Sequence, residues 1–323
     1  KEVETLFGII HDLKEKGITI LYISHKMNEI FQMCDRATVL RDGKYIKTIE
    51  MAKTTRDEVI QAMVGRDISL FAKRTMPCQK KGTEPVLRVD GLCSDLFNQI
   101  SFDLYAGEIL GFFGLVGAGR TEVMRAIFGA DPYTKGSVIL NGKEIHCKSP
   151  HEAIERGIAL ISENRKEEGI LPNFDNKDNI SLASLKKYMS GIVINDNKKK
   201  QNALEKGKQV GLKPNDPAFM TVSLSGGNAQ KVILARWMST DATVMIFDEP
   251  TKGIDIGAKA DIYLLMEKMA EQGVAIIMVS SELTEVMGMS DRIIVMRDGE
   301  ITGELAKEEF SEQNILNYTV EGN

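Results

Sequence analysis

The chain has 323 residues, of which 43% are hydrophobic and 27% are charged, and its formal net charge is −5 at pH 7. This length suggests about two domains, and the composition is that of a globular protein with a sizeable core. Because the charge balance is acidic, we expect no basic surface that would recruit nucleic acid. The four cysteines form no C-x-x-C pair, which indicates reduced thiols rather than a metal site or a disulfide framework. No apolar run reaches the roughly 18 residues of a transmembrane span, so any membrane association is expected to depend on partners.

The N-terminal segment predicts a helix followed by a buried strand. Apolar residues recur with helical spacing over residues 2–13, and Lys16-Gly17 ends the pattern. The apolar run 18–23 then predicts a strand. A domain rarely starts inside a helix, so we expect the chain to begin partway through a domain.

An internal repeat supports that expectation. A shift that places residue 1 on residue 257 superimposes residues 1–66 on 257–322 without a gap. The matched positions include Gly17 and Gly273, Ser24 and Ser280, Glu29 and Glu285, and Arg41-Asp42-Gly43 and Arg297-Asp298-Gly299. The predicted organisation is therefore the end of one domain in residues 1–69, a linker in 70–85 and a complete second copy in 86–323. Before the linker, Thr55 and Glu58 have the spacing of a helix capping box.

A glycine-rich loop between a predicted strand and a predicted helix indicates phosphate binding. The strand covers residues 108–113, and the helix starts at Thr121. In such a loop, backbone N–H groups surround a phosphate, a basic side chain reaches it, and a hydroxyl holds Mg²⁺. Arg120 occupies the position where lysine is usual. The candidate nucleotide-binding residues are Gly114, Gly117, Ala118, Gly119, Arg120 and Thr121, and Thr121 is also a candidate metal ligand.

Two acidic residues directly follow another predicted strand. The apolar run 243–247 has the character of a buried parallel strand, which would deliver Asp248 and Glu249 to the carboxyl edge of a sheet. Two acids after such a run indicate a metal site more than a surface pair, and Asp248 is the candidate metal ligand.

A hydroxyl and two glycines open a further predicted helix. Ser225, Gly226 and Gly227 precede the amphipathic segment 228–238. Free backbone N–H groups and the helix dipole at such an N-terminus favour an anion. These three residues are therefore also candidate nucleotide-binding residues.

The remaining patterns complete the predicted fold. Residues 86–104 predict a small antiparallel layer, and residues 158–161 predict a short strand. Residues from about 164 to 222 predict a mostly helical insertion, in which the lysines at 198–200 are expected to form a solvated turn. Phe97 is expected in the core rather than stacked on an adenine. The fold class is α/β, with a parallel core sheet, a small antiparallel β layer and a helical insertion on a P-loop NTPase framework.

These motifs together resemble the ATP-binding cassette family of transport ATPases, over essentially the whole chain. The matching segments are the signature at 224–230, the Walker A loop at 114–121, the Walker B strand at 243–249 and the D-loop at 251–255. Within the family, the chain is most similar to the tandem ATPase subunits of bacterial monosaccharide importers. Among these, it most resembles the ribose-type subunit, and the galactose and xylose types are close relatives. The segments that indicate this are 161–166, 249–259 and 279–282.

The resemblance implies roles for individual residues. Two cassettes of this family sandwich two nucleotides head to tail, and each site combines Walker motifs of one cassette with the signature of the other. Asp248 would hold Mg²⁺ and Glu249 would orient the attacking water. His25 matches the switch histidine, Glu163 takes the place of the metal-sensing glutamine, and Asp255 belongs to the D-loop. His25 as an ordinary core histidine is the alternative.

Three departures from the family pattern affect the second cassette's own site. The loop lysine is Arg120, the sensing glutamine is Glu163, and the switch histidine is Ser281, the repeat partner of His25. These changes predict a site that binds ATP and turns over slowly or not at all. Hydrolysis is expected at the composite site formed by the Walker motifs of a missing first cassette with His25 and the signature residues Ser225–Gly227.

The implied cofactors are ATP and Mg²⁺. The implied partners are membrane permease subunits, the first cassette of the same subunit and, indirectly, a periplasmic or lipid-anchored sugar-binding protein. The expected location is peripheral, at the cytoplasmic face of the cell membrane. Two alternatives stay open: a soluble twin-cassette ATPase of translation or repair, and a regulatory nucleotide-binding module without catalysis.

Overall fold

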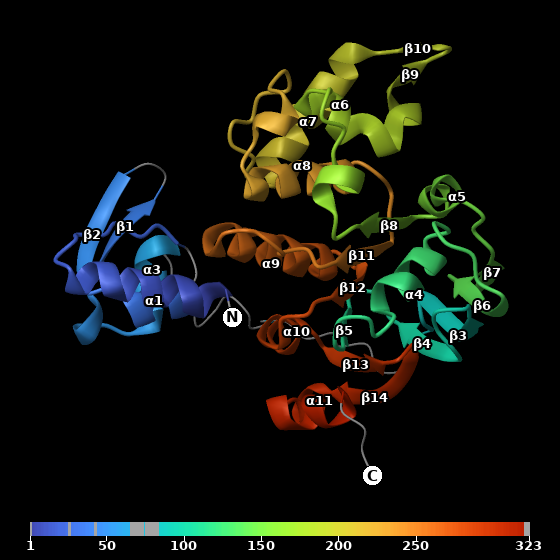
Figure 1. Cartoon of the computed structure of the whole chain (residues 1–323). Coiled ribbons are helices and arrows are strands. Elements are labelled where there is room, and N and C mark those ends of the chain that lie inside the picture. Colours follow the sequence, from blue (N-terminus) through green and yellow to red (C-terminus); the bar gives the residue numbers. More distant parts are fainter. Residues whose placement is uncertain (1, 25–26, 42–43, 65–73, 75–83, 320–323) are drawn as a thin grey trace. The chain divides into compact units, whose positions relative to one another are not determined.

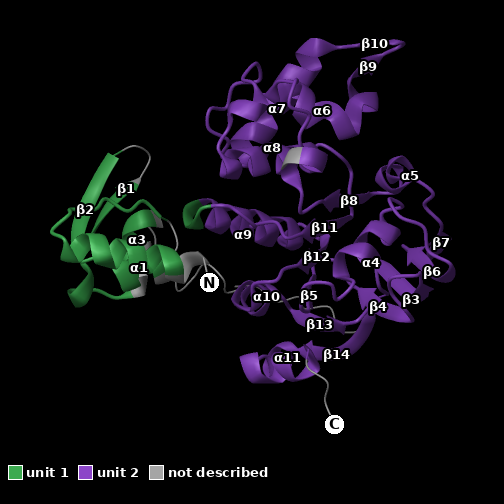
Figure 2. Ribbon diagram, viewed as in Figure 1, with its two compact units in different colours: residues 1–70, 255–257 green, residues 71–254, 258–323 purple. Residues whose placement is uncertain are grey.

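The computed structural model describes residues 2–24, 27–41, 44–64, 74 and 84–319 (Figure 1). The chain divides into two compact units. The first contains residues 1–70 and 255–257, and the second contains residues 71–254 and 258–323 (Figure 2). No helix in the described part of the chain is both long and apolar enough to cross a bilayer.

The first unit combines helices with one antiparallel strand pair. Its elements are α1 (Glu2–Glu15), α2 (Met27–Met33), β1 (Arg36–Arg41), β2 (Lys44–Glu50), η1 (Met51–Lys53) and α3 (Arg56–Val64). The core is small and includes Ile30, Met51 and Val59. The predicted capping box is confirmed, because the Glu58 N–H donates to Thr55 Oγ1 at 3.3 Å and the Thr55 N–H donates to Glu58 Oε2 at 3.4 Å.

The buried strand predicted for residues 18–23 is wrong. This segment has no strand structure, and Leu21 and Ile23 are 95% and 98% exposed. Its repeat partner is β12 (Ala275–Val279), which pairs in parallel with a strand on each side. The 323 residues contain no second copy of those two neighbours, so the first-copy segment lacks the backbone partners that a parallel strand requires.

The second unit is built on a six-stranded sheet in the order β14-β13-β5-β12-β11-β8. Its strands are β5 (Ile109–Phe113), β8 (Ile158–Ile161), β11 (Val244–Asp248), β12, β13 (Arg292–Arg297) and β14 (Glu300–Ala306). All neighbours are parallel except β13 and β14, which form a hairpin. The hairpin turns at Asp298 and Gly299, whose φ angles of 49° and 78° suit a two-residue turn. The predicted α/β fold with a parallel core sheet is confirmed.

The predicted antiparallel layer is a four-stranded sheet in the order β4-β3-β6-β7. Its strands are β3 (Leu87–Cys93), β4 (Ile100–Leu104), β6 (Lys135–Leu140) and β7 (Lys143–Ile145). Phe102 of this sheet meets Phe112 of the central sheet edge to face, with ring centroids 5.1 Å apart. Phe97 is 4% exposed and belongs to the core, as predicted.

Helices connect and cover the two sheets. They are α4 (Arg120–Ile127), α5 (Pro150–Glu155), α9 (Ile256–Glu271), α10 (Leu283–Met289), η6 (Lys307–Glu309) and α11 (Glu312–Thr319). Cys34, Cys93 and Cys147 are free thiols, as expected, and Cys78 lies outside the described residues.

The insertion is mostly helical and leads into the helix that starts at the signature. Its elements are η3 (Arg165–Gly169), α6 (Asn176–Ser181), η4 (Leu182–Tyr188), β9 (Met189–Ser190), β10 (Val193–Ile194), α7 (Asp196–Gln209) and η5 (Thr221–Ser223), followed by α8 (Gly226–Met238). In Figure 1, α6, α7 and α8 lie together beyond the edge strand β8.

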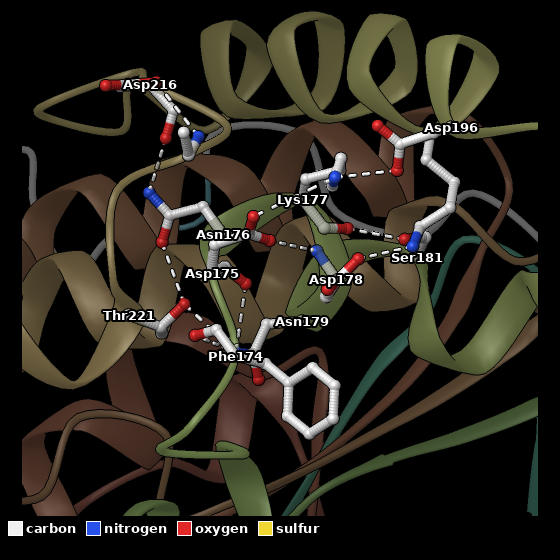
Figure 3. Close-up of polar contacts among 12 residues, drawn as sticks. Phe174, Asp175, Asn176, Lys177, Asp178, Asn179, Ser181, Asp196, Asp216 and Thr221 are labelled. Atoms are coloured by element: carbon white, nitrogen blue, oxygen red, sulfur yellow. Dashed lines mark hydrogen bonds and ion pairs between the residues drawn. The ribbon is translucent and has the colours of Figure 1, made fainter.

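Buried polar side chains hold the insertion together. Thr221 Oγ1 donates to Asn176 Oδ1 at 2.9 Å, and Asn176 Nδ2 donates to the Asp216 carbonyl oxygen at 3.0 Å (Figure 3). Arg236 of α8 donates to the Asn179 carbonyl oxygen at 2.7 Å and to its Oδ1 at 3.0 Å. Because Arg236 and Asn179 are both buried, α8 is fixed to α6 by charge-assisted bonds in a dry environment.

The expected solvated turn at the lysine run is wrong. Lys198, Lys199 and Lys200 lie inside α7, and Lys199 is buried, with its ammonium paired to the Asp178 carboxylate of α6. Three consecutive helical residues point in different directions, so one of them faces the neighbouring helix while the other two stay outside.

Candidate functional site

The glycine-rich loop turns sharply between β5 and α4. A Cβ atom on Gly114 would lie 2.4 Å from the Met296 carbonyl oxygen, so only glycine fits there. Gly119, immediately before α4, has a φ of 89°, in the left-handed region that favours glycine. The loop therefore leads strand to helix in the order that phosphate-binding loops require, with the α4 N-terminus at its end.

Arg120 crosses from this loop to the ends of two central strands. Its side chain is buried, Nη1 donates to the Ser280 carbonyl oxygen at 2.9 Å, and Nη2 lies 3.9 Å from Glu249 Oε1. Ser280 follows β12, and Glu249 follows β11. The guanidinium thus links the loop to both strand ends, and it faces the acidic group predicted to activate water.

Asp248 ends β11 and is 2% exposed. Burial, joined by the charges of Glu249 and Glu163, raises the pKa of Asp248 to about 7, against the hydrogen bond from Thr121. Its Oδ1 has no hydrogen-bond partner among the described residues. An unsatisfied buried carboxylate oxygen beside a hydroxyl fits Mg²⁺, which prefers oxygen ligands and takes the remainder from phosphate and water.

Glu249 has an unusual backbone. Its φ of 48° lies in the left-handed region, which costs a non-glycine residue energy and often marks a functional position. The side chain accepts a hydrogen bond from Ser281 Oγ at 3.2 Å. Burial raises the pKa of Glu249, and Ser281 and Arg120 oppose that rise. The carboxylate is therefore held between the residue at the switch position and the loop arginine.

Glu163 lies after β8 and is exposed, and its carboxylate pairs with the ammonium of Lys252. This hydrogen bond raises the pKa of Lys252. Lys252 thereby offsets the negative charge of Glu163. The sequence pattern indicates no role for Lys252, although this residue lies within the 249–259 segment.

The signature residues occupy a different part of the second unit. Ser225 precedes α8, and its Oγ accepts a hydrogen bond from Asn228 Nδ2 at 3.1 Å. Helix α8 contacts the edge strand β8, whereas the phosphate loop follows the central strand β5. The structure brings together Arg120, Thr121, Asp248, Glu249 and Ser281, and it places the signature residues Ser225, Gly226 and Gly227 apart from that group.

Arg165 connects the signature to the segment after the acidic pair. Its guanidinium donates to the Gly226 carbonyl oxygen at 2.8 Å, the Lys252 carbonyl oxygen at 2.9 Å and the Gly253 carbonyl oxygen at 3.4 Å. The sequence indicates Arg165 only as part of the 161–166 segment, because bonds to backbone carbonyls leave no pattern of side-chain types. Of the other predicted residues, Asp255 is exposed before α9, and His25 lies outside the described residues.

Comparisons with known proteins agree with this geometry. The profile of the family described as ABC transporter matches residues 97–252. An ATP-binding cassette solved in a post-hydrolysis state with ADP and Pi aligns with 69% of this chain and 100% of its own, with a TM-score of 0.60 and 21% identity. A cassette of an ABC transporter in its ADP conformation aligns with 73% and 94%, with a TM-score of 0.61 and 20% identity. Residues 97–252 therefore form a domain of the ATP-binding cassette family.

Within that family, the chain is similar to two curated ribose import ATP-binding proteins named RbsA. The protein of Oceanobacillus iheyensis is 44% identical over 325 residues, which cover 100% of this chain and 65% of the relative. The protein of Lactococcus lactis is 44% identical over 322 residues, again 100% of this chain and 65% of the relative. The chain thus spans less than two thirds of the length of these relatives.

Proposed function

We propose that this chain is the larger part of an ATP-hydrolysing subunit that energises import of a monosaccharide, ribose being the first choice. The observation that supports this most is the similarity to ribose import ATP-binding proteins over the whole chain. The group of Arg120, Thr121, Asp248 and Glu249 at the ends of the central strands adds a site suited to a nucleotide phosphate and Mg²⁺.

The second cassette's own site is proposed to bind Mg²⁺-ATP and to hydrolyse it slowly or not at all. The loop N–H groups and Arg120 would hold the phosphates, and Thr121 and Asp248 would hold the metal ion. Arg120 and Ser281 engage Glu249 on two sides, which opposes its action as a base on water. A planar guanidinium also fails to reproduce the compact ammonium of lysine.

Hydrolysis is assigned to a composite site. It would combine the Walker motifs of a first cassette preceding this chain with His25 and the signature residues Ser225–Gly227. We call the resulting molecule the two-cassette protein. The linker assignment of residues 70–85 and the helical insertion of about 164–222 belong to the same proposal.

The proposed partners are permease subunits and, through them, a periplasmic or lipid-anchored sugar-binding protein. The proposed location is the cytoplasmic face of the cell membrane. Uptake of labelled ribose, galactose and xylose by cells that lack the gene tests this assignment. Loss of uptake of one sugar, restored by the gene, is the expected result, and unchanged uptake of all three contradicts it.

A regulatory module that binds ATP without hydrolysis is the second candidate, and the contact of Arg120 with Glu249 favours it. The repeat offers a matched test in the two-cassette protein. His25→Ala should reduce steady-state ATPase roughly 100-fold or more, and Ser281→Ala should change it less than about threefold. ATPase that survives His25→Ala while Glu249→Gln abolishes it would move hydrolysis to the second site. No ATPase in the unmodified protein would favour the regulatory module.

A further inference from the structure

Five residues of the second unit form a connected group around the signature, which we call the Arg165 clamp. They are Glu163, Arg165, Gly226, Lys252 and Gly253. We propose that Arg165 is a positioning residue that fixes the orientation of the signature residues Ser225–Gly227 relative to the end of β11, where Asp248 and the following Glu249 lie. This inference rests on the proposed function, because the signature is taken to act on the nucleotide of the first cassette.

The three bonds of Arg165 join two segments that are far apart in sequence. Gly226 is the first residue of α8. Lys252 and Gly253 lie shortly after β11, which ends at Asp248. Arginine offers five N–H donors in a rigid planar fork, so one side chain can hold several carbonyl oxygens at once. A lysine has a single ammonium on a flexible stem and does not reproduce that fork. The contact therefore depends on arginine.

The segment that carries Arg165 is itself attached twice to the same residue. Glu163 pairs with the Lys252 ammonium, while Arg165 binds the Lys252 carbonyl oxygen. Because these two contacts start from residues 163 and 165, the segment 163–165 cannot rotate about either contact alone. An exposed ion pair by itself contributes little to stability, so the Glu163 pair is a secondary restraint and the half-buried Arg165 is the main one.

The position of Glu163 gives the clamp its functional meaning. By the resemblance to the ATP-binding cassette family, residue 163 takes the place of the metal-sensing glutamine. Here it is bound to Lys252, and the clamp extends from it to Gly226. The direction of the signature N–H groups is thereby set by side-chain contacts within the second unit. A second site that does not hydrolyse ATP can then still present the signature correctly to the first site.

The clamp can be tested on the 323-residue chain by amide hydrogen exchange. Arg165→Met should speed exchange in residues 226–231 by roughly tenfold, because the first turn of α8 loses its anchor. Arg165→Lys keeps the charge and should show a smaller increase, and it covers the case in which the methionine variant folds poorly. Arg88→Lys is the matched control, since Arg88 pairs with Asp103 on the antiparallel sheet. Unchanged exchange in both Arg165 variants overturns the clamp.

Activity then tests the positioning role. In the two-cassette protein, Arg165→Lys should lower kcat roughly 10- to 100-fold with a change in KM for ATP below about threefold, because a misplaced signature affects the reacting geometry more than ground-state binding. Faster exchange with unchanged kcat overturns the positioning role. If the unmodified protein has no ATPase, the proposed function fails, and the exchange measurement still decides whether the clamp exists.

The ion pair provides an independent check. Glu163→Lys alone should speed exchange in residues 226–231, and the double swap Glu163→Lys with Lys252→Glu should restore most of the protection. Restoration identifies the pair as part of the clamp. Equal exchange in the single and double variants would mean that the side chains of Glu163 and Lys252 contribute nothing to the clamp, and that Arg165 alone forms it.

Discussion

The two copies of the repeat start from the same pattern and reach different structures. Residues 275–279 form the buried central strand β12, whereas the matching residues 19–23 form no strand, and Leu21 and Ile23 are exposed. Yet a local hydrogen bond is the same in both copies. Ser24 Oγ donates to Glu29 Oε2 at 2.9 Å, and Ser280 Oγ donates to Glu285 Oε2 at 3.0 Å.

The difference separates local from non-local causes. A serine and a glutamate five residues apart meet through the local turn of the chain, so their bond forms in either copy. A parallel strand depends on neighbours supplied by distant residues, and only the second copy has them. The apolar sequence is thus insufficient for the strand on its own.

The largest expected effect tests whether the proposed first cassette supplies such neighbours to residues 19–23. In the two-cassette protein, the exchange rate of amides 19–23 should be lower than in this chain by roughly 100-fold or more. The reason is that the amides of a central strand exchange only when the whole unit unfolds. Amides 275–279 provide the internal control and should not change. Hydrogen exchange read by mass spectrometry measures both segments together. Equal exchange of 19–23 in the two proteins would mean that the first copy never forms the strand.

The serine–glutamate pair that both copies share differs in its surroundings, which gives the next effect. Glu285 is buried and also accepts from Thr251 Oγ1 at 2.7 Å and Lys259 Nζ at 2.7 Å. Glu285→Ala should destabilise the second unit by about 3 kcal/mol or more, since Lys259 loses a buried partner. Glu29→Ala should cost about 1 kcal/mol in the first unit.

Trp237 makes that comparison measurable. It is the single tryptophan of the chain and lies in the second unit, so its fluorescence during urea unfolding reports that unit. Glu285→Ala should shift the midpoint, and Glu29→Ala should not. Glu282→Gln is the matched control, because Glu282 also pairs with Lys259 but is half-exposed. A shift as large for Glu282→Gln as for Glu285→Ala would refute the role of burial.

Much of the second unit was predictable because its strands and its phosphate loop follow from local sequence. The structure of residues 18–23 in the first copy was not predictable, because it depends on distant residues. The runs before Gly114 and Asp248 are apolar and bounded by motifs, so their strand character and the phosphate loop follow from local sequence. The exposure of residues 18–23 and the burial of Lys199 depend on distant partners. At the site, side-chain types identified Asp248 and Glu249, but the Arg120 bond to the Ser280 carbonyl oxygen has no signal in the sequence.

The burial of Asp248 predicts a pH effect in the second unit. Its pKa of about 7 lies above its ordinary value near 3.8, so the folded state holds a proton that the unfolded state releases between those values. Stability is therefore lost as pH rises through that window. Asp248→Asn should match the original protein near pH 4 and exceed it by on the order of 2 kcal/mol at pH 8.

Urea unfolding followed at Trp237 from pH 4 to pH 8 measures this difference. Asp241→Asn, at an exposed aspartate, is the control and should leave the profile unchanged. Mg²⁺-ATP should stabilise the original protein more at pH 8 than at pH 6, because the metal ion binds the ionised carboxylate. A difference between Asp248→Asn and the original that is the same at every pH would place the effect in packing.

The smallest effect concerns the helix caps, where the two copies differ at both capping positions: Thr55 matches Ser311, and Glu58 matches Asn314. Thr55 Oγ1 accepts the Glu58 N–H at 3.3 Å, and its repeat partner Ser311 Oγ accepts the Asn314 N–H at 3.1 Å. Only the first copy has the reciprocal bond, from the Thr55 N–H to Glu58. Thr55→Ala and Ser311→Ala should each cost about 1 kcal/mol of local helix stability.

Replacing residue 58 or 314 isolates the reciprocal bond. Glu58→Ala should speed exchange at the start of α3, whereas Asn314→Ala should leave the start of α11 nearly unchanged apart from helix propensity, since Asn314 Nδ2 binds the Glu309 carbonyl oxygen instead of the cap. Exchange rates of the first-turn amides in each helix give the comparison. If both variants change by the same factor, the reciprocal bond contributes nothing, and the two copies are capped by the hydroxyl alone.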